Sequence, residues 1–553
     1  MRVKLITSLV LAVVLLGTTA YTSYMMPGVP EPPLTELRLL SGAGSGLSPV
    51  VYPSVLGASV DWTDDCQGLY NHVSGLLEPE PVGELISSDP AYLRFPATGI
   101  SQSYNWTHGI GTSEQRRMNP SHGTKPQKCY FGTDEFMGLI NHTGARPVIV
   151  VNAATGNPRE AADWVSYCND VYWRGKGPLR TQNGHLQPYG IKYWEIGFEM
   201  HQAQYWDSDP DQTTPAGVRY ANRLMAYSQA MKAVDPTILV GASLVLHSDV
   251  ESSSADMSWN INVLNTARGT FTQGGRTLRY FDYVTVTVRT PRVSVLLDVP
   301  DLFAYSYART YESLQDDLAQ LRGLLYFPNE VPIAISSFVP DFTSRGWNTD
   351  APACAGSALI TANIAMEALR SAASSDPRAL LYACYGDISS RSYTSMLVNP
   401  DFEANAGSAW LPSPSYFAMD LCSVLHGMVC VEVARLRTSE YSVGGERALT
   451  AIRGVPTVDA VAGISADGLT ARVVIINREV DGPSRVVVSV EGWSGLMSVT
   501  RTVISSDSLL TTNLLGDGVR TVSEGWRSGE PRVEVEVPRG SVMLLELERQ
   551  GVG

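Results

Sequence analysis

The fold of this chain is decided by the stretch Lys192-Tyr193-Trp194-Glu195-Ile196-Gly197-Phe198-Glu199. A short β-prone run ends at Gly197, and the carboxylate of Glu199 follows two residues later. This order is typical of a strand in a (β/α)₈ barrel, because barrel proteins place their functional groups at the carboxyl ends of the strands.

The flanking sequence repeats the strand pattern. Between about residues 50 and 427, short runs rich in β-branched and aromatic residues alternate with amphipathic helical segments, which is typical of βα units around a parallel sheet. Eight such runs are present, the number that a closed barrel requires. They cover 55–62, 92–96, 147–152, 193–197, 238–243, 283–288, 332–336 and 379–384.

Turn and cap residues support the helices between these runs. Asn157-Pro158 supplies an N-cap and a proline at the first helical position. Gly144 stands where a helix ending at residue 142 or 143 needs a left-handed residue. Later helices are expected over 311–325 and 357–373.

The last part of the chain has a different pattern. From residue 428 to 553, apolar strands alternate with Gly, Asp and Ser turns and no helical period intervenes, which predicts an antiparallel, jelly-roll-like β-sandwich. Six strands are expected, at 460–464, 471–476, 484–490, 498–503, 532–537 and 541–547.

The first 49 residues are expected to lie outside the barrel. Residues 1–26 combine a basic start at Arg2 and Lys4 with an apolar run, which indicates a signal peptide or an uncleaved signal anchor. Residues 27–49 are rich in Pro, Gly and Ser and predict a linker, with one possible strand around 34–40. We therefore expect a secreted, extracellular or luminal protein, associated with a membrane only through this segment if it is uncleaved.

The net charge of the chain limits the ligands that it can bind, and its cysteines and sequons indicate possible modifications. The net charge of −14 argues against nucleic acid and against polyanions such as heparan sulfate, so a neutral glycan fits better. Seven cysteines are thinly spread without zinc spacing; some are open to pairing, and no metal or cofactor is implied. Asn105 and Asn141 begin glycosylation sequons, of which Asn141, at an expected helix end, is the better acceptor.

The motif at 193–199 resembles Tyr-Trp-Glu-Ile-Gly-Asn-Glu, which marks the α-L-arabinofuranosidases of glycoside hydrolase family 51. Similar stretches occur in order at 151–156, 161–169 and 183–190, and at 93–96 and 537–542. The resemblance implies a glycosidase-like barrel over 50–427 followed by a sandwich over 428–553. Heparanase-like glycosidases are a weaker match, through 91–95, and the acidity of the chain argues against their substrate.

The resemblance also implies the positions of the catalytic groups. The family's acid/base corresponds to Glu199, and its nucleophilic glutamate, at the end of the seventh strand, corresponds to Ser337. A serine without an adjacent base is a poor nucleophile. Glu330 and Asp341 flank this strand, but Glu330 precedes it and Asp341 lies four residues beyond Ser337, so neither is a good substitute.

The substrate-binding positions that the resemblance implies are partly kept and partly changed. Arg94, Trp106 and Asn152 are retained, each with an alternative structural role: ion pairing, packing and backbone capping, respectively. The changed positions are Phe198 for an asparagine, Thr287 for a histidine, Asp61 for a glutamate and Ala97-Thr98 for two glycines.

Two functions follow from these changes. Losses at four separate strands favour a non-hydrolytic protein that binds a neutral glycan or serves, with a protein partner, as an extracellular structural component. The alternative is an active retaining α-L-arabinofuranosidase with a rearranged nucleophile.

Overall fold

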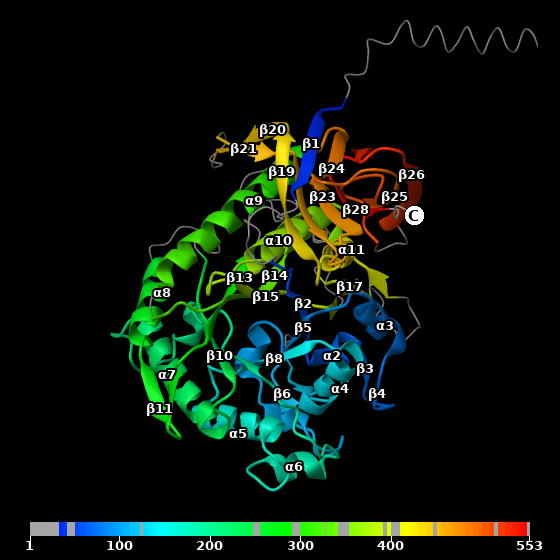
Figure 1. Ribbon diagram of the computed structural model, residues 1–553. Helices are drawn as coiled ribbons and strands as arrows, with labels where there is room; N and C mark the ends of the chain where they lie inside the picture. Colours follow the sequence, from blue (N-terminus) through cyan, green and yellow to red (C-terminus); the bar gives the residue numbers. More distant parts are fainter. Residues whose placement is uncertain are drawn as a thin grey trace, which may run out of the picture.

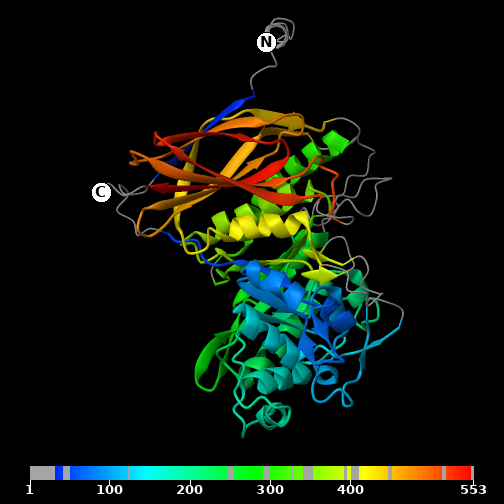
Figure 2. The same cartoon turned by 90° about the vertical axis from the view of Figure 1, so that its right-hand side faces the viewer.

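A computed structural model describes residues 32–40, 50–121, 125–246, 255–289, 299–326, 328–340, 353–390, 395–399, 410–445, 451–513 and 518–549. It consists of a helix-wrapped barrel and a β-rich domain that packs against two of the barrel's helices, residues 357–372 and 414–423 (Figures 1 and 2). Asp341 and the N-terminal segment 1–26 lie outside the described residues.

Eight parallel strands form a closed barrel in the order β10-β13-β14-β15-β2-β5-β8-β9. Parallel pairing of β15 with β2, with Ala383 opposite Leu56, closes the ring. The predicted (β/α)₈ barrel is therefore confirmed, with each strand within a few residues of its expected place. The strands are β2 Leu56–Ser59, β5 Tyr92–Phe95, β8 Arg146–Val151, β9 Tyr193–Ile196, β10 Leu239–Ser243, β13 Tyr283–Arg289, β14 Ile333–Val339 and β15 Leu380–Tyr385.

Helices surround the barrel (Figure 1). The Asn157 side chain accepts a hydrogen bond from the backbone N–H of Glu160, and Gly144 has φ +72°, so both expected caps are present. A short turn, α2 (Thr63–Gln67), has left-handed dihedral angles. The other helices are α3 Pro79–Ser87, α4 Thr133–Thr143, α5 Pro158–Asn169, α6 Gly177–Gln182, α7 Ala216–Val234, α8 Ala255–Thr266, α9 Val299–Leu324, α10 Ser357–Ala372 and α11 Pro414–Ser423.

The β-rich domain is a nine-stranded sheet in the order β26-β25-β28-β23-β22-β19-β1-β24-β27. Its strands are β1 Leu34–Leu40, β19 Val429–Arg437, β22 Val458–Ile464, β23 Thr470–Asn477, β24 Ser484–Val490, β25 Met497–Ser505, β26 Arg520–Ser528, β27 Arg532–Val537 and β28 Ser541–Arg549. Side chains from β23 and β28 share one core with side chains from β24 and β27, although these strand pairs are well separated in the order. The sheet therefore folds over on itself as a sandwich.

β1 comes from the segment interpreted as a linker. It pairs antiparallel with β19 and parallel with β24, so it occupies an interior position in the sheet. Leu37 and Leu39 point into the sandwich core. Residues 34–40 thus hold the start of the described chain within the C-terminal domain.

The cysteines do not pair. All seven are free, and six of them are buried in the packing of separate elements. Burial raises the pKa of the Cys129 thiol to about 12 and that of the Cys422 thiol to about 12. The possible disulfides left open by the sequence are therefore not formed in this structure.

Candidate functional site at the carboxyl ends of the barrel strands

The loop after β9 presents the central carboxylate. Gly197 has φ +80°, and a β-carbon there would lie 2.4 Å from the Met200 side chain, so glycine is required. Two residues later Glu199 also takes a positive φ, +47°, which non-glycine residues adopt rarely and often at functional positions. Its side chain is 6% exposed. The sequence motif therefore places Glu199 at the carboxyl end of β9.

Both oxygens of the Glu199 carboxylate are engaged. Oε1 accepts hydrogen bonds from the Arg289 guanidinium, through Nη2 and, at 3.1 Å, through Nε. Oε2 accepts from the Gln202 amide. A proton donor must turn a carboxyl oxygen toward the departing group, and here each oxygen already has a protein partner.

Ser337 and Thr287 lie side by side at the ends of β14 and β13. They are register partners, and both side chains are buried. The pairing of β14 is irregular on both sides here, with register shifts against β13 and β15. Such bulges change where a strand end points its side chains. The position that the sequence resemblance assigns to the nucleophile is thus a buried serine hydroxyl on an irregularly paired part of β14.

Arg94 forms a buried ion pair, which is the structural role that the sequence allowed as an alternative to ligand binding. Its Nε lies 2.9 Å and its Nη2 2.8 Å from Oε2 of Glu195, inside the barrel. The Tyr382 hydroxyl donates to the other Glu195 oxygen at 2.6 Å. The Phe198 ring covers the guanidinium, with 4.8 Å from Arg94 Cζ to the ring centre. Among the described residues, Arg94 Nη1 has no hydrogen-bond partner.

The loops after β2 and β5 carry the next expected positions. Asp61 is buried, and its Oδ1 accepts from the backbone N–H of Thr63 at 2.9 Å. After β5, Thr98 has φ +54° and ψ −160°, a backbone region populated mainly by glycine. Thr98 therefore keeps the conformation of the glycine that the resemblance places there, although its side chain is β-branched.

Trp106 and Asn152 serve local packing and capping. Trp106 is 2% exposed: its ring lies parallel to that of Trp164, 6.0 Å away, and its Nε1 donates to the Glu160 carbonyl at 3.1 Å. Asn152 accepts from the backbone N–H of Thr155 at 2.9 Å and donates to that residue's hydroxyl at 2.8 Å. Trp106 thus offers no open ring face for a sugar in this structure.

Sequence reasoning missed three residues of this site. Arg289 ends β13 two positions after Thr287, so strand alternation would have placed both on one face. Glu195 is a charged residue within the expected strand at 193–197, which indicates a buried partner but does not identify Arg94. Gln202 lies in a loop, and nothing in the sequence indicates its contact with Glu199.

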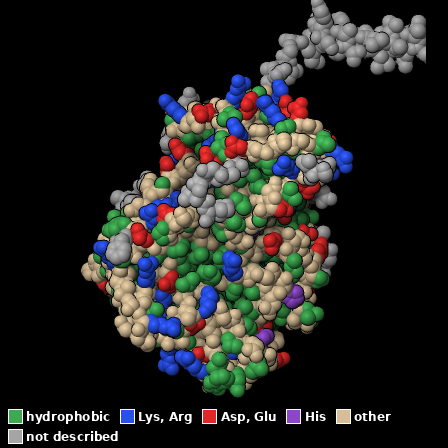
Figure 3. All heavy atoms as spheres, in the orientation of Figure 1, with side chains coloured by type: hydrophobic (Ala, Val, Ile, Leu, Met, Phe, Trp, Pro, Cys, Tyr) green, Lys and Arg blue, Asp and Glu red, His purple; other side chains and the backbone are tan. Residues whose placement is uncertain are grey.

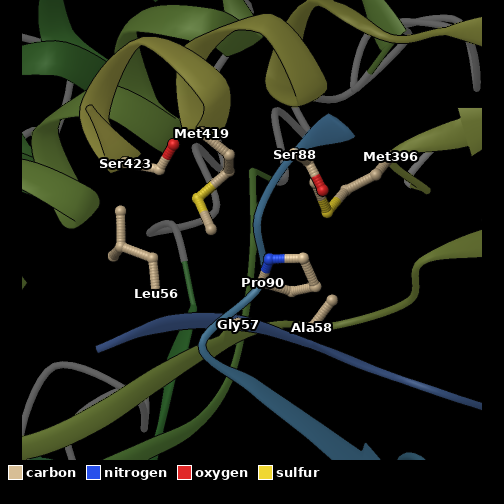
Figure 4. A pocket seen from close by; sticks show the side chains of 8 residues that line it. All are labelled: Leu56, Gly57, Ala58, Ser88, Pro90, Met396, Met419 and Ser423. Atoms are coloured by element: carbon tan, nitrogen blue, oxygen red, sulfur yellow. The ribbon is translucent and has the colours of Figure 1, made fainter. Parts of the chain in front are cut away.

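A small cavity elsewhere is not a sugar site. It lies between β2 and α11 and is lined by Leu56, Gly57, Ala58, Ser88, Pro90, Met396, Met419 and Ser423 (Figure 4). Its volume of about 10 Å³ is close to that of a single water site. The lining carries no ionisable side chain, so this cavity supports no acid–base chemistry.

The two sequons differ in their surroundings. The Asn105 side chain accepts from the backbone N–H of Thr107 at 3.0 Å and from its hydroxyl at 2.7 Å, so the asparagine is tied to its own sequon. Asn141 is exposed on the last turn of α4. The described helices include none long and apolar enough to cross a membrane.

Part of this chain is similar in sequence to known proteins. A family model described as the alpha-L-arabinofuranosidase 1 domain matches residues 89–273, which contain β5, β8, β9 and β10. Probable alpha-L-arabinofuranosidase C of Aspergillus clavatus is 36% identical over 153 residues, 26% of this chain and 28% of that protein. Intracellular exo-alpha-(1->5)-L-arabinofuranosidase 1 of Bacillus subtilis is 32% identical over 152 residues, again 28% of its length. The chain thus aligns with less than a third of each of these relatives.

Solved structures match over nearly the whole chain. The alpha-L-arabinofuranosidase of Thermotoga maritima, solved with arabinose, superposes with a TM-score of 0.74 at 20% identity, covering 93% of this chain and all of that one. The family 51 arabinofuranosidase of Xanthomonas axonopodis gives 0.72 at 18% identity over 94% of this chain. At such identities the structures establish the fold.

The chain therefore has the fold of these solved arabinofuranosidase structures, a (β/α)₈ barrel followed by a C-terminal β-sandwich. Within the barrel, residues 89–273 are similar to the alpha-L-arabinofuranosidase 1 domain.

Proposed function

We propose that this protein is a non-hydrolytic member of the arabinofuranosidase-like class that binds a neutral glycan or serves as an extracellular structural component. The observation that carries the proposal is the Glu199 carboxylate, held on one side by Arg289 and on the other by Gln202. Both oxygens of this carboxylate are thus bound by protein side chains at the mouth of the barrel.

The second catalytic group is also missing from its expected place. Retaining hydrolysis needs two carboxyl groups about 5 to 5.5 Å apart, one of which attacks the sugar. Ser337 stands at that position, buried and beside Thr287. Glu330 precedes β14 and therefore lies at the opposite end of the barrel. The described residues supply no carboxylate on β14 to replace the nucleophile.

The buried ion pair inside the barrel supports the proposal, because it holds the barrel together without the two catalytic positions. Arg94 and Glu195 form a fully buried ion pair, and removal of one partner of such a pair typically costs about 3 to 5 kcal/mol. This pair therefore has a structural role in the barrel interior. Ser337 takes no part in it, so a hydroxyl at that position is compatible with an intact barrel.

An active retaining α-L-arabinofuranosidase is the second candidate. It is favoured by Glu199, which remains at the carboxyl end of β9, and by the names of the relatives that match residues around it. In that case the substrate is an arabinose-containing glycan, and another group performs the attack.

Hydrolysis of an aryl α-L-arabinofuranoside distinguishes the two. We expect no turnover by the native protein and little by Ser337→Glu, because Phe198 still removes a sugar-binding hydrogen bond of the kind that contributes in the transition state. Phe198→Asn with Ser337→Glu should recover trace activity. Adding Arg289→Ala, which releases Oε1 of Glu199, should raise that activity further.

The control is Glu199→Gln in the triple variant, which should abolish the recovered activity. Robust turnover by the native protein that disappears on Glu199→Gln would refute the non-hydrolytic function and favour the second candidate.

We also propose that the protein enters the secretory route, as the basic and apolar start of the sequence indicates. Exposure of Asn141 on α4 is compatible with glycosylation there. After expression in a glycosylating host, enzymatic deglycosylation should lower the mass of the native protein and leave Asn141→Gln unchanged. An unmodified product that retains Met1 would contradict this.

A further inference from the structure

An exposed aromatic pair lies far from the barrel mouth. Tyr172 and Trp173 are 53% and 68% exposed, and their rings meet edge to face, 4.5 Å apart at 87°. They lie on the connection from α5 to β9, which enters β9 at its amino end, whereas Glu199 follows the carboxyl end of that strand. Figure 3 shows hydrophobic side chains gathered at this end of the molecule, where Figure 1 places α6.

The turn that carries the pair is hydrogen-bonded to the last turn of α5. The Ser166 hydroxyl donates to Asp170 Oδ2 at 2.6 Å and accepts from the backbone N–H of Lys176 at 2.7 Å. Gly175 has φ +53°, and a β-carbon there would lie 2.2 Å from Ser166 Oγ and from Asp170 Oδ2. The aromatic pair is thus presented on a rigid turn, which lowers the entropy cost of binding.

A basic residue, Arg174, directly follows Trp173 in the sequence. Arg174 Nε lies 3.3 Å from Asp170 Oδ1, and the Arg174 side chain is still largely exposed. Its remaining guanidinium N–H groups can donate to hydroxyl groups of a ligand. The surface therefore combines two apolar ring faces with hydrogen-bond donors beside them.

We infer that Tyr172 and Trp173 form a second binding site for a neutral polysaccharide, separate from the barrel mouth and independent of whether hydrolysis occurs there. A sugar ring has an apolar C–H face that packs on an aromatic ring and hydroxyl groups that accept from Arg174. Size favours this ligand: a stable protein interface buries about 800 Å² from each partner, more than two aromatic side chains of roughly 150 to 250 Å² each can supply. The chain's charge of −14 disfavours an anionic membrane.

Native affinity electrophoresis tests the site. The full-length protein is run in gels that contain soluble arabinoxylan, linear arabinan, mixed-linkage β-glucan or galactomannan, and in a gel without polysaccharide. We expect at least one polysaccharide to retard the native protein. Trp173→Ala should weaken that binding about tenfold, as expected for loss of one or two aromatic contacts, and Trp173→Phe should restore most of it.

Two variants serve as controls. Tyr326→Ala removes another exposed tyrosine with an arginine over its ring, and Arg289→Ala alters the barrel mouth. Neither should change the retardation. The proposed site is refuted if Trp173→Ala leaves the retardation intact or if Arg289→Ala abolishes it. It is also refuted if none of the four polysaccharides retards the native protein.

A membrane surface and a second copy of the chain are the competing ligands, and each would give a different experimental result. Trp173-dependent sedimentation with phosphatidylcholine vesicles, without retardation in the gels, would assign the pair to a membrane surface. Trp173-dependent self-association in analytical ultracentrifugation, again without retardation, would assign it to a second copy of the chain. Either result refutes the polysaccharide site.

Discussion

Thr98 has a backbone conformation that suits glycine better than threonine. Its φ of +54° and ψ of −160° cost a β-branched residue about 1 to 3 kcal/mol, whereas glycine in the unfolded chain costs roughly 0.5 to 1 kcal/mol more entropy than alanine. Thr98→Gly should therefore stabilise the protein by about 0.5 to 2 kcal/mol. The measurement is the midpoint of denaturant unfolding.

Ala97→Gly is the matched control for this prediction. Ala97 is buried and does not share the positive φ, so its replacement should destabilise the protein by about 0.5 to 1 kcal/mol. If both glycine variants lower stability equally, Thr98 is not strained.

At the scale of elements, one buried carboxylate joins α4, α5 and the segment before β9. Asp134 accepts from the Tyr167 hydroxyl at 2.8 Å and from the Tyr189 hydroxyl at 2.7 Å. Asp134→Ala leaves both hydroxyl groups without this acceptor, and each buried unsatisfied group costs about 1 to 3 kcal/mol. We expect a loss of roughly 2 to 5 kcal/mol in the free energy of unfolding.

The Asp134 carboxyl also makes the stability of the protein depend on pH. Burial raises the pKa of Asp134, against hydrogen bonds from Tyr189 and Tyr167 that lower it. The folded state therefore holds this proton more tightly than the unfolded state. The protonated Asp134 carboxyl therefore contributes fully to the free energy of unfolding below its unfolded-state pKa of about 3.9. This contribution is lost as pH rises through the raised pKa of the folded state.

Asp134→Asn isolates this effect. As pH rises through that window, the native protein should lose unfolding free energy relative to Asp134→Asn. Asp163→Asn, which removes a partly exposed pair with Lys176, should change stability by less than about 1 kcal/mol at any of these pH values. A difference between native protein and Asp134→Asn that does not vary with pH would contradict the raised pKa.

At the scale of the whole molecule, one ionic cluster connects the barrel with the sandwich. Asp459 on β22 pairs with Arg370 of α10 at 2.8 Å, with Arg478 at 3.2 Å and with Arg435 of β19 at 3.3 Å. Burial opposes ionisation of Asp459, but the three guanidinium groups outweigh it and hold its pKa well below the usual range. Stability from this group is therefore present above about pH 3.9 and is lost only as pH falls toward the folded pKa.

Asp459→Asn should accordingly destabilise the molecule at neutral pH by about 3 to 5 kcal/mol, since it leaves buried arginines without their carboxylate. Calorimetry should show a lower Tm and a separation of barrel and sandwich transitions. Glu524→Gln, at the exposed Arg501 pair, is the control and should cost less than about 1 kcal/mol. Equal effects of the two substitutions would show that the cluster does not couple the domains.

The sequence by itself determined the barrel, because each strand repeats a local pattern of apolar runs and turn residues that needs no knowledge of distant segments. It also placed Glu199 just after a strand through its spacing from Gly197, whereas Ser337 was assigned through the resemblance to a known family. By contrast, β26 has largely exposed, polar residues, and its strand conformation comes from pairing with β25. A strand at 34–40 was expected from the sequence, but its place inside the sandwich sheet comes from its partners β19 and β24.

Only the tertiary structure decided what each site residue contacts. Arg94 and Glu195 lie 101 positions apart, and Arg289 and Glu199 lie 90 apart. No local pattern encodes such pairs, since closure of the barrel brings the strands together. Trp106 likewise became a packing residue because α5 places Trp164 parallel to its ring. Hydrophobic periodicity thus fixed the scaffold, whereas the partners of the charged and aromatic groups at the mouth depended on long-range packing.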